Sequence, residues 1–93
     1  MEFKNSIQIG RKSAWVDTFK GDGQQPVTVL RSYLTQVAFV QGQTGYYSNS
    51  YYYGGKTHTT GRHISIFRRA YPGVTWYEVD HDIFCRKLWK TLA

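Results

Sequence analysis

Residues 27–41 place the strongest constraint on how this chain can fold. The segment is rich in β-branched and aromatic residues, and its side chains alternate only in part between apolar and polar. Neither alternating set is wholly polar, so we expect a central strand, or two strands that are broken around Arg31 and Ser32. Pro26 directly precedes the segment, at a position where its missing amide donor costs no ladder hydrogen bond.

Further strands are predicted on both sides of this segment. Apolar side chains within residues 6–20 are interrupted near Gly10, which predicts two short strands or a bent hairpin. Glycine, aspartate and proline at residues 21–26 indicate a loop. A turn at residues 42–45 leads into residues 46–53, which we expect to pair antiparallel with the strand before them. Residues 74–79 alternate as one more strand.

Two helices are predicted after the tyrosine-rich stretch. In the first, Ile64, Phe67 and Tyr71 recur at the spacing of one helical face. Thr59 or Thr60 is its expected N-cap, because a threonine oxygen can accept from a free amide of the first turn. Pro72 and Gly73 then end this helix.

The second helix has an apolar stripe of Phe84, Leu88 and Leu92. Its expected cap is Asp80 or Asp82. Together these elements predict an α+β fold, with an antiparallel sheet of about four to five strands packed with two helices.

A chain of 93 residues has room for one hydrophobic core, so we expect a single domain over residues 1–93. A domain of this size is marginally stable by itself, so we expect a homo-oligomer, which would stabilise it as a bound ligand also would. The single cysteine, Cys85, favours a reducing compartment and is expected to be a buried, inert thiol. No signal peptide or membrane-spanning run is recognisable, so we expect a cytoplasmic protein that has no membrane partner.

Charge and aromatic content point to an anionic partner. No acidic residue occurs between Asp22 and Glu78, although that interval holds five of the basic residues and all eight tyrosines. The chain carries a formal net charge of +6 at pH 7, and its cations in this interval have few intramolecular partners. Arginines that hold phosphates beside tyrosines that stack on bases are typical of nucleotide and nucleic-acid recognition.

The expected contact region is the glycine-rich turn at residues 54–57 together with the helix that follows it. Backbone amides at a helix start attract anions without any catalytic machinery. The candidate ligand-binding residues are Lys56, Thr59, Thr60, Arg62, His63, Arg68 and Arg69, with Tyr47, Tyr51 and Tyr53 as stacking rings. An ordinary hairpin that runs into a normally capped helix is the alternative interpretation. The turn lacks the leading glycine of a phosphate-binding P-loop, so nucleotide hydrolysis is not favoured.

Catalytic and metal sites are not predicted. His58 and His63 are five residues apart and have no cysteine or carboxylate nearby in the sequence, so their spacing does not indicate a metal site. Asp80, His81 and Cys85 could serve a small hydrolase, but the aspartates are better explained as helix caps. We therefore expect a protein that is not an enzyme and that requires no cofactor.

Two short motifs resemble small uncharacterised proteins of phages and plasmids. Residues 32–38 (SYLTQVA) match an S-Y-x-T-x-V-A strand, and residues 59–64 (TTGRHI) match a T-T-x-x-H-I helix start. The shared positions would be Tyr33, Thr59, Thr60 and His63, whereas the tyrosine run departs from the pattern. The resemblance implies a viral accessory protein that acts in the cytosol of the host cell.

These observations lead to two functional hypotheses. The first is a small basic binding protein that captures a phosphate-containing ligand, either a nucleotide signal or single-stranded nucleic acid, to counter bacterial defence. The second is a protein that inhibits a host defence protein through a tyrosine-rich interface, since tyrosine and arginine are equally suited to protein interfaces.

Overall fold

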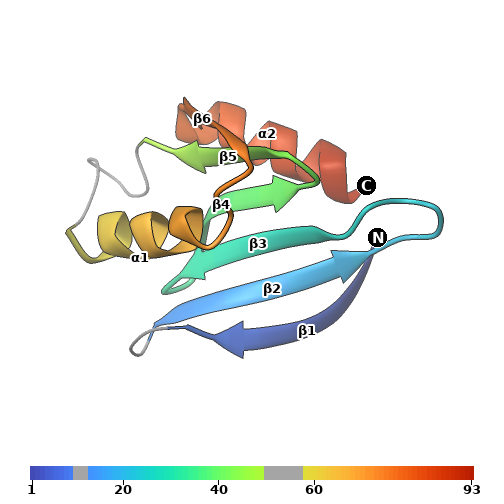
Figure 1. Cartoon of the computed structure of the whole chain (residues 1–93), viewed down its shortest axis with the longest axis horizontal. Coiled ribbons are helices and arrows are strands. Elements are labelled where there is room, and N and C mark those ends of the chain that lie inside the picture. Colours follow the sequence, from blue (N-terminus) through green and yellow to red (C-terminus); the bar gives the residue numbers. More distant parts are fainter. Residues whose placement is uncertain (10–12, 50–57) are drawn as a thin grey trace.

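The computed structural model of the chain describes residues 1–9, 13–49 and 58–93. These residues form one six-stranded sheet and two helices (Figure 1). In chain order the elements are β1 (Glu2–Gln8), β2 (Ala14–Lys20), β3 (Val27–Ser32), β4 (Thr35–Gln41), β5 (Thr44–Ser48), α1 (His58–Arg69), β6 (Thr75–Val79) and α2 (His81–Leu92).

The sheet follows the order of the chain, from β1 at one edge to β6 at the other. Its first five strands pair antiparallel with their neighbours, whereas β6 pairs parallel with β5. A parallel neighbour needs a crossover connection, and α1 lies in that connection. The predicted α+β class is confirmed, with one strand more than expected and one parallel pair in a mostly antiparallel sheet.

The central segment divides into two strands, but the break lies later than we expected. β3 continues through Arg31 and Ser32, and the chain turns at Tyr33 and Leu34 before β4 begins. Tyr33 has a φ of 56°, in the left-handed region that few side chains adopt. Because Arg31 and Ser32 still pair with β4, the polar side chains that suggested a break belong to the hairpin itself.

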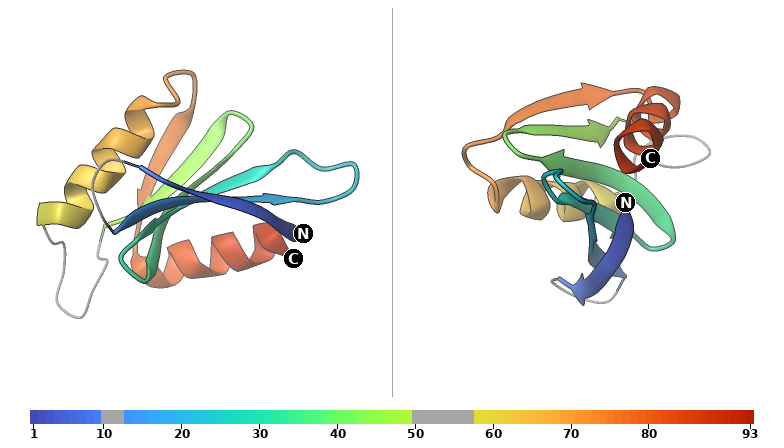
Figure 2. Two further views of the ribbon diagram at one scale, coloured as in Figure 1. Left: turned by 90° about the horizontal axis from the view of Figure 1, so that it is seen from below. Right: turned by 90° about the vertical axis from the view of Figure 1, so that its right-hand side faces the viewer.

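Each face of the central hairpin is covered by one helix, and Figure 2 shows the sheet between the two helices. On one side Leu30, Val37, Ala38 and Val40 pack with Ile64 and Phe67 of α1. On the other side Val27, Val29 and Phe39 pack with Phe84 and Leu88 of α2. Burial on both faces explains why neither alternating set of this segment is polar.

The outer strands and the helix ends refine the other predictions. Residues 6–20 do contain a hairpin, although β1 begins as early as Glu2. α1 begins at His58, so Thr59 and Thr60 lie inside its first turn and the predicted threonine N-cap is wrong. Asp80 does occupy the N-cap position of α2, but its side chain makes no capping hydrogen bond. The N-terminal ammonium of Met1 donates to the carbonyl oxygen of Leu92 at 2.9 Å, which ties the two ends of the chain together.

A glycine in β5 sets the distance between that strand and a tryptophan of β6. Gly45 is buried and is the register partner of Trp76. A Cβ atom at position 45 would lie 2.5 Å from two carbons of the indole ring, so the ring rests directly on the glycine backbone. Phe67 and Tyr47 contact the same ring edge-on, with centroid distances of 5.8 and 6.4 Å. The indole therefore has little room to move away.

We expect Gly45→Ala to lower the free energy of unfolding by about 1–3 kcal/mol, because the added methyl group overpacks this contact. Gly61→Ala is the matched control. Its Cβ would meet nothing within 4 Å, and alanine in the interior of α1 should raise stability by about 0.5–1 kcal/mol. Urea unfolding followed by circular dichroism measures both changes. Equal stability of wild type and Gly45→Ala would contradict the contact.

A candidate anion site between helix α1 and strand β6

The last turn of α1 places Arg68, one of the predicted ligand-binding residues, against two aromatic rings. The guanidinium carbon of Arg68 lies 4.4 Å from the ring centroid of Tyr47 in β5 and 5.9 Å from that of Trp76 in β6. A cation over aromatic faces is attracted by their negative quadrupoles, by about 0.5–2 kcal/mol. Arg68 is held between secondary-structure elements that are fixed by the sheet and the core.

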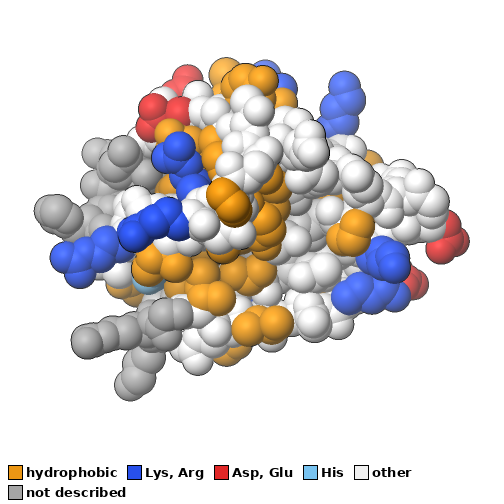
Figure 3. Space-filling model, in the orientation of Figure 1, with side chains coloured by type: hydrophobic (Ala, Val, Ile, Leu, Met, Phe, Trp, Pro, Cys, Tyr) orange, Lys and Arg blue, Asp and Glu red, His pale blue; other side chains and the backbone are white. Residues whose placement is uncertain are grey.

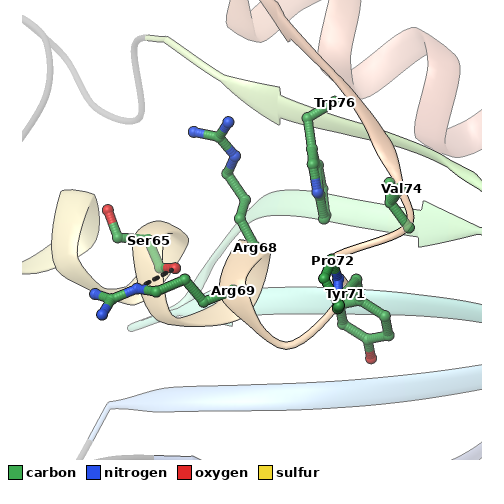
Figure 4. A pocket seen from close by; sticks show the side chains of 7 residues that line it. All are labelled: Ser65, Arg68, Arg69, Tyr71, Pro72, Val74 and Trp76. Carbon is green, nitrogen blue, oxygen red and sulfur yellow. Dashed lines mark hydrogen bonds between the residues drawn. The ribbon is translucent and has the colours of Figure 1, made fainter.

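A pocket of about 470 Å³ opens beside this arginine. Its lining residues come from the last turns of α1, the following turn and the start of β6, and are Ser65, Arg68, Arg69, Tyr71, Pro72, Val74 and Trp76 (Figure 4). Arg69 is oriented by its own helix, because its Nε donates to the carbonyl oxygen of Ser65 at 3.4 Å. Among the described residues no carboxylate lines the pocket, so its electrostatic character there is positive.

Two buried hydrogen-bond donors in the pocket lack an acceptor. Arg68 Nε and Trp76 Nε1 are both inaccessible to solvent and have no partner within the described part of the chain. Leaving a buried donor unpaired costs about 1–3 kcal/mol, and more when the group is charged. Both atoms are closed to a water-sized probe, so a ligand with acceptor oxygens would remove that cost where the Arg68 and Trp76 side chains shift to expose them. Glu78 follows two residues after Trp76 on the same side of β6, but it is exposed and does not line the pocket.

The predicted site residues separate into two groups along α1. Thr59 and Arg62 are exposed near its first turn, and Arg68 and Arg69 lie in its last turn. At a rise of about 1.5 Å per residue, Arg62 and Arg68 are roughly 9 Å apart along the helix axis. Figure 3 shows Lys and Arg side chains gathered over α1. The structure thus brings Arg68 against Tyr47, places Arg69 in the same pocket as Arg68, and leaves the first-turn residues at the other end of a basic helix.

Two predicted ligand residues are buried in the core. Ser32 Oγ lies 2.8 Å from His63 Nδ1 and 3.0 Å from Thr60 Oγ1, at the contact between β3 and α1. We expected Thr60 and His63 to face a ligand, whereas both side chains are buried and engaged with Ser32. Burial lowers the pKa of His63, which favours a neutral imidazole inside the domain.

Lys56, Tyr51 and Tyr53 lie outside the described residues, so their assignment to the site stays a prediction. Five lining residues were not predicted as site residues: Ser65, Tyr71, Pro72, Val74 and Trp76. Trp76 had a recognisable place in a strand, but nothing in the sequence indicated that this strand would lie parallel to β5. Only that pairing carries the indole over Gly45 and next to Arg68.

A second polar cluster lies at the start of α2. His81 Nδ1 is 3.0 Å from Ser48 Oγ, and His81 Nε2 is 3.5 Å from Cys85 Sγ. This order of groups resembles a nucleophile, a base and an orienting hydroxyl. However, burial and, to a smaller extent, the negative charge of Asp82 raise the pKa of the Cys85 thiol. A raised pKa disfavours the thiolate, which is the reactive form.

The fold and the pocket define a small α+β protein with a basic, aromatic cavity at one edge of its sheet. The chain belongs to a family of unknown function, DUF8033, whose sequence pattern matches residues 3–80. That range includes all of the sheet except Glu2, together with α1 and the described lining of the pocket, and it ends before α2. Comparisons with curated proteins and with solved structures gave no match.

Neither described helix is long and apolar enough to cross a bilayer. The described residues also contain no cluster of three or more His, Cys, Asp or Glu side chains that could hold a metal ion.

We expect the buried state of His63 to make stability depend on pH. Its pKa is lowered in the folded protein, so the unfolded chain binds the extra proton first as pH falls below the ordinary histidine value of about 6.5. The contribution of the neutral His63 side chain to the free energy of unfolding is complete above that pH. It is lost as the pH falls below it, by at most about 1.4 kcal/mol per pH unit. Urea unfolding between pH 7.5 and 5 should show a steeper loss for wild type than for His63→Asn. If the free energy of unfolding fell equally with pH in wild type and His63→Asn, the buried neutral state of His63 would be contradicted.

Proposed function

We propose that this protein is a non-enzymatic binding module that captures a phosphate-containing ligand in the pocket between α1 and β6. The observation that carries the proposal is the pair of buried donors, Arg68 Nε and Trp76 Nε1, which have no acceptor within the described residues. Both residues line one pocket, whose described lining contains a second arginine and no carboxylate. A phosphate group offers several acceptor oxygens and the negative charge that such a lining lacks.

The size and the composition of the pocket support a small ligand or one part of a larger one. Its volume of about 470 Å³ lies within the range of about 300–1,000 Å³ that is typical of small-molecule sites. Trp76 and Tyr71 supply flat apolar surface beside the cations. This mixture suits a nucleotide or a nucleic-acid strand, in which a phosphate and a base lie close together. The net charge of +6 draws such ligands toward the protein from a distance.

The biological setting that we propose follows from the resemblance to phage and plasmid proteins. A phage accessory protein of this kind would bind a nucleotide signal or a single strand in the host cytosol and so counter bacterial defence. A binding role without turnover is supported by Cys85, whose raised thiol pKa leaves the nearby His81 without an activated nucleophile.

We expect pyrophosphate, ADP and short oligonucleotides to shift the indole N–H resonance of Trp76 in proton–nitrogen NMR spectra, because that donor gains an acceptor. The chain has three tryptophans, and Trp76→Phe identifies the resonance. Arg68→Gln should weaken binding by about tenfold or more, since it removes a charge-assisted hydrogen bond that is worth about 1.5–3 kcal/mol.

Arg86→Gln is the matched control, because Arg86 is exposed on α2, lies outside the pocket and carries the same charge. It should change affinity by less than about twofold at 150 mM salt. Thermal unfolding of each variant separates lost binding from lost structure. An unmoved Trp76 resonance, or equal weakening by Arg68→Gln and Arg86→Gln, would count against the pocket.

The second candidate function is protein–protein association through an exposed interface, either with a host defence protein that it inhibits or with a second copy of this chain. It is favoured by two large apolar side chains that face solvent: Leu34 is 92% exposed and Trp89 is 73% exposed. Isolated apolar residues are common on protein surfaces, so this observation is weaker than the unpaired donors.

If those residues form an interface, we expect association that persists at about 1 M salt, where phosphate binding weakens. Sedimentation velocity at low and high salt measures the association, with Leu34→Ser and Trp89→Ser as variants that should abolish it. A sedimentation coefficient that is identical for wild type and both variants at all salt concentrations would exclude self-association through these side chains.

A further inference from the structure

Three aromatic rings form a ladder across the sheet on the side of α2. Phe39 of β4 and Tyr46 of β5 are register partners, and their rings stack with a centroid distance of 5.3 Å and an angle of 29°. Tyr46 and Tyr77 of β6 are also register partners and stack at 5.4 Å and 28°. The ladder starts in the core, where Phe39 contacts Phe84 of α2, and runs outward to the edge of the sheet.

The ladder ends with a ring that is half exposed. Tyr77 retains 49% of its accessible surface, and β6 is the last strand in the order of the sheet. One face of its ring is occupied by Tyr46, and no strand among the described residues continues the ladder on the other side. The inner rings hold Tyr77 in place, so a flat ligand ring can stack on it with little loss of side-chain entropy.

A cation accompanies the ladder. The Nζ atom of Lys87, on α2, lies 4.9 Å from the ring centroid of Tyr46. Lys87 is exposed and can therefore also reach an anionic group beside Tyr77. Of the nearby carboxylates, Glu78 lies on the opposite side of β6, and Asp80 and Asp82 lie at the first turn of α2. The surface that adjoins the exposed ring thus combines stacking area with one cation, Lys87.

We infer that the ligand class is single-stranded nucleic acid, with one base stacked on Tyr77 and a neighbouring phosphate in the Arg68–Trp76 pocket. This inference rests on the proposed function. Trp76 and Tyr77 are consecutive residues of the edge strand, so their Cα atoms are about 3.8 Å apart and their side chains leave opposite sides of the sheet. A flexible strand that passes over the β6 edge reaches both positions. A duplex cannot, because its bases are paired and stacked inside the helix.

The inference is tested with a fluorescently labelled oligothymidylate of about ten nucleotides, the matching duplex, and pyrophosphate. Anisotropy measures affinity for the nucleic acids, and calorimetry measures affinity for pyrophosphate. We expect Tyr77→Ala to weaken single-strand binding by about tenfold and to change pyrophosphate binding by less than about twofold. Tyr77→Phe keeps the stacking ring and should bind like wild type. Lys87→Gln should weaken the single strand more than Lys90→Gln, which is exposed on the same helix.

The outcomes separate this inference from the proposed function. Pyrophosphate binding that depends on Arg68, together with single-strand binding that is unchanged in Tyr77→Ala, would overturn the inference and leave the pocket intact. Absence of pyrophosphate binding, together with single-strand binding that depends on Tyr77, would overturn the pocket and support the stacking site. Equal affinity for the single strand and the duplex would also overturn the inference.

Discussion

The structure depends on a hairpin that is buried on both of its faces. Leu30 and Ala38 meet α1, whereas Val29 and Phe39, their neighbours along β3 and β4, meet α2. Each helix is therefore needed to keep apolar surface from water, at about 25 cal/mol for each Å² that is buried. Because the helices must lie on opposite sides, the chain has to pass from one face to the other between them. The strand β6 makes that passage along the sheet edge, next to β5.

Because β6 passes along the edge of the sheet, the aromatic residues of both candidate contact surfaces lie at that edge. Alternation along β6 sends Trp76 toward α1 and Tyr77 toward α2, so two aromatic residues adjacent in sequence serve two different surfaces. On the first surface, Gly45 allows the indole to approach the backbone, and Arg68 packs against it. On the second, the ladder that begins at Phe39 fixes the orientation of Tyr77. Both arrangements use the rigidity of the sheet to hold side chains that the proposed ligand would contact.

Several features could be predicted from the sequence because they depend on local pattern. The faces of both helices follow from spacing, and the lack of acidic residues identified Arg68 and Arg69 as cations without nearby partners. The helical spacing also contained a signal that we did not use. Thr60 lies three residues before His63 and seven before Phe67, on the face that was expected to be apolar. Their burial beside Ser32 is consistent with that spacing, and it explains why neither side chain faces solvent.

The sequence by itself determined the α+β class, the buried strand segment at residues 27–41 and the basic, tyrosine-rich character of the middle of the chain, because propensity, periodicity and charge act over a few residues. Only the tertiary structure decided that β6 would lie parallel to β5, and with it the pocket and the outer end of the aromatic ladder. That pairing joins residues about thirty positions apart, from Thr44 with Thr75 to Ser48 with Val79. No local preference encodes such a contact, since it results from the need to cover both faces of one sheet with two helices.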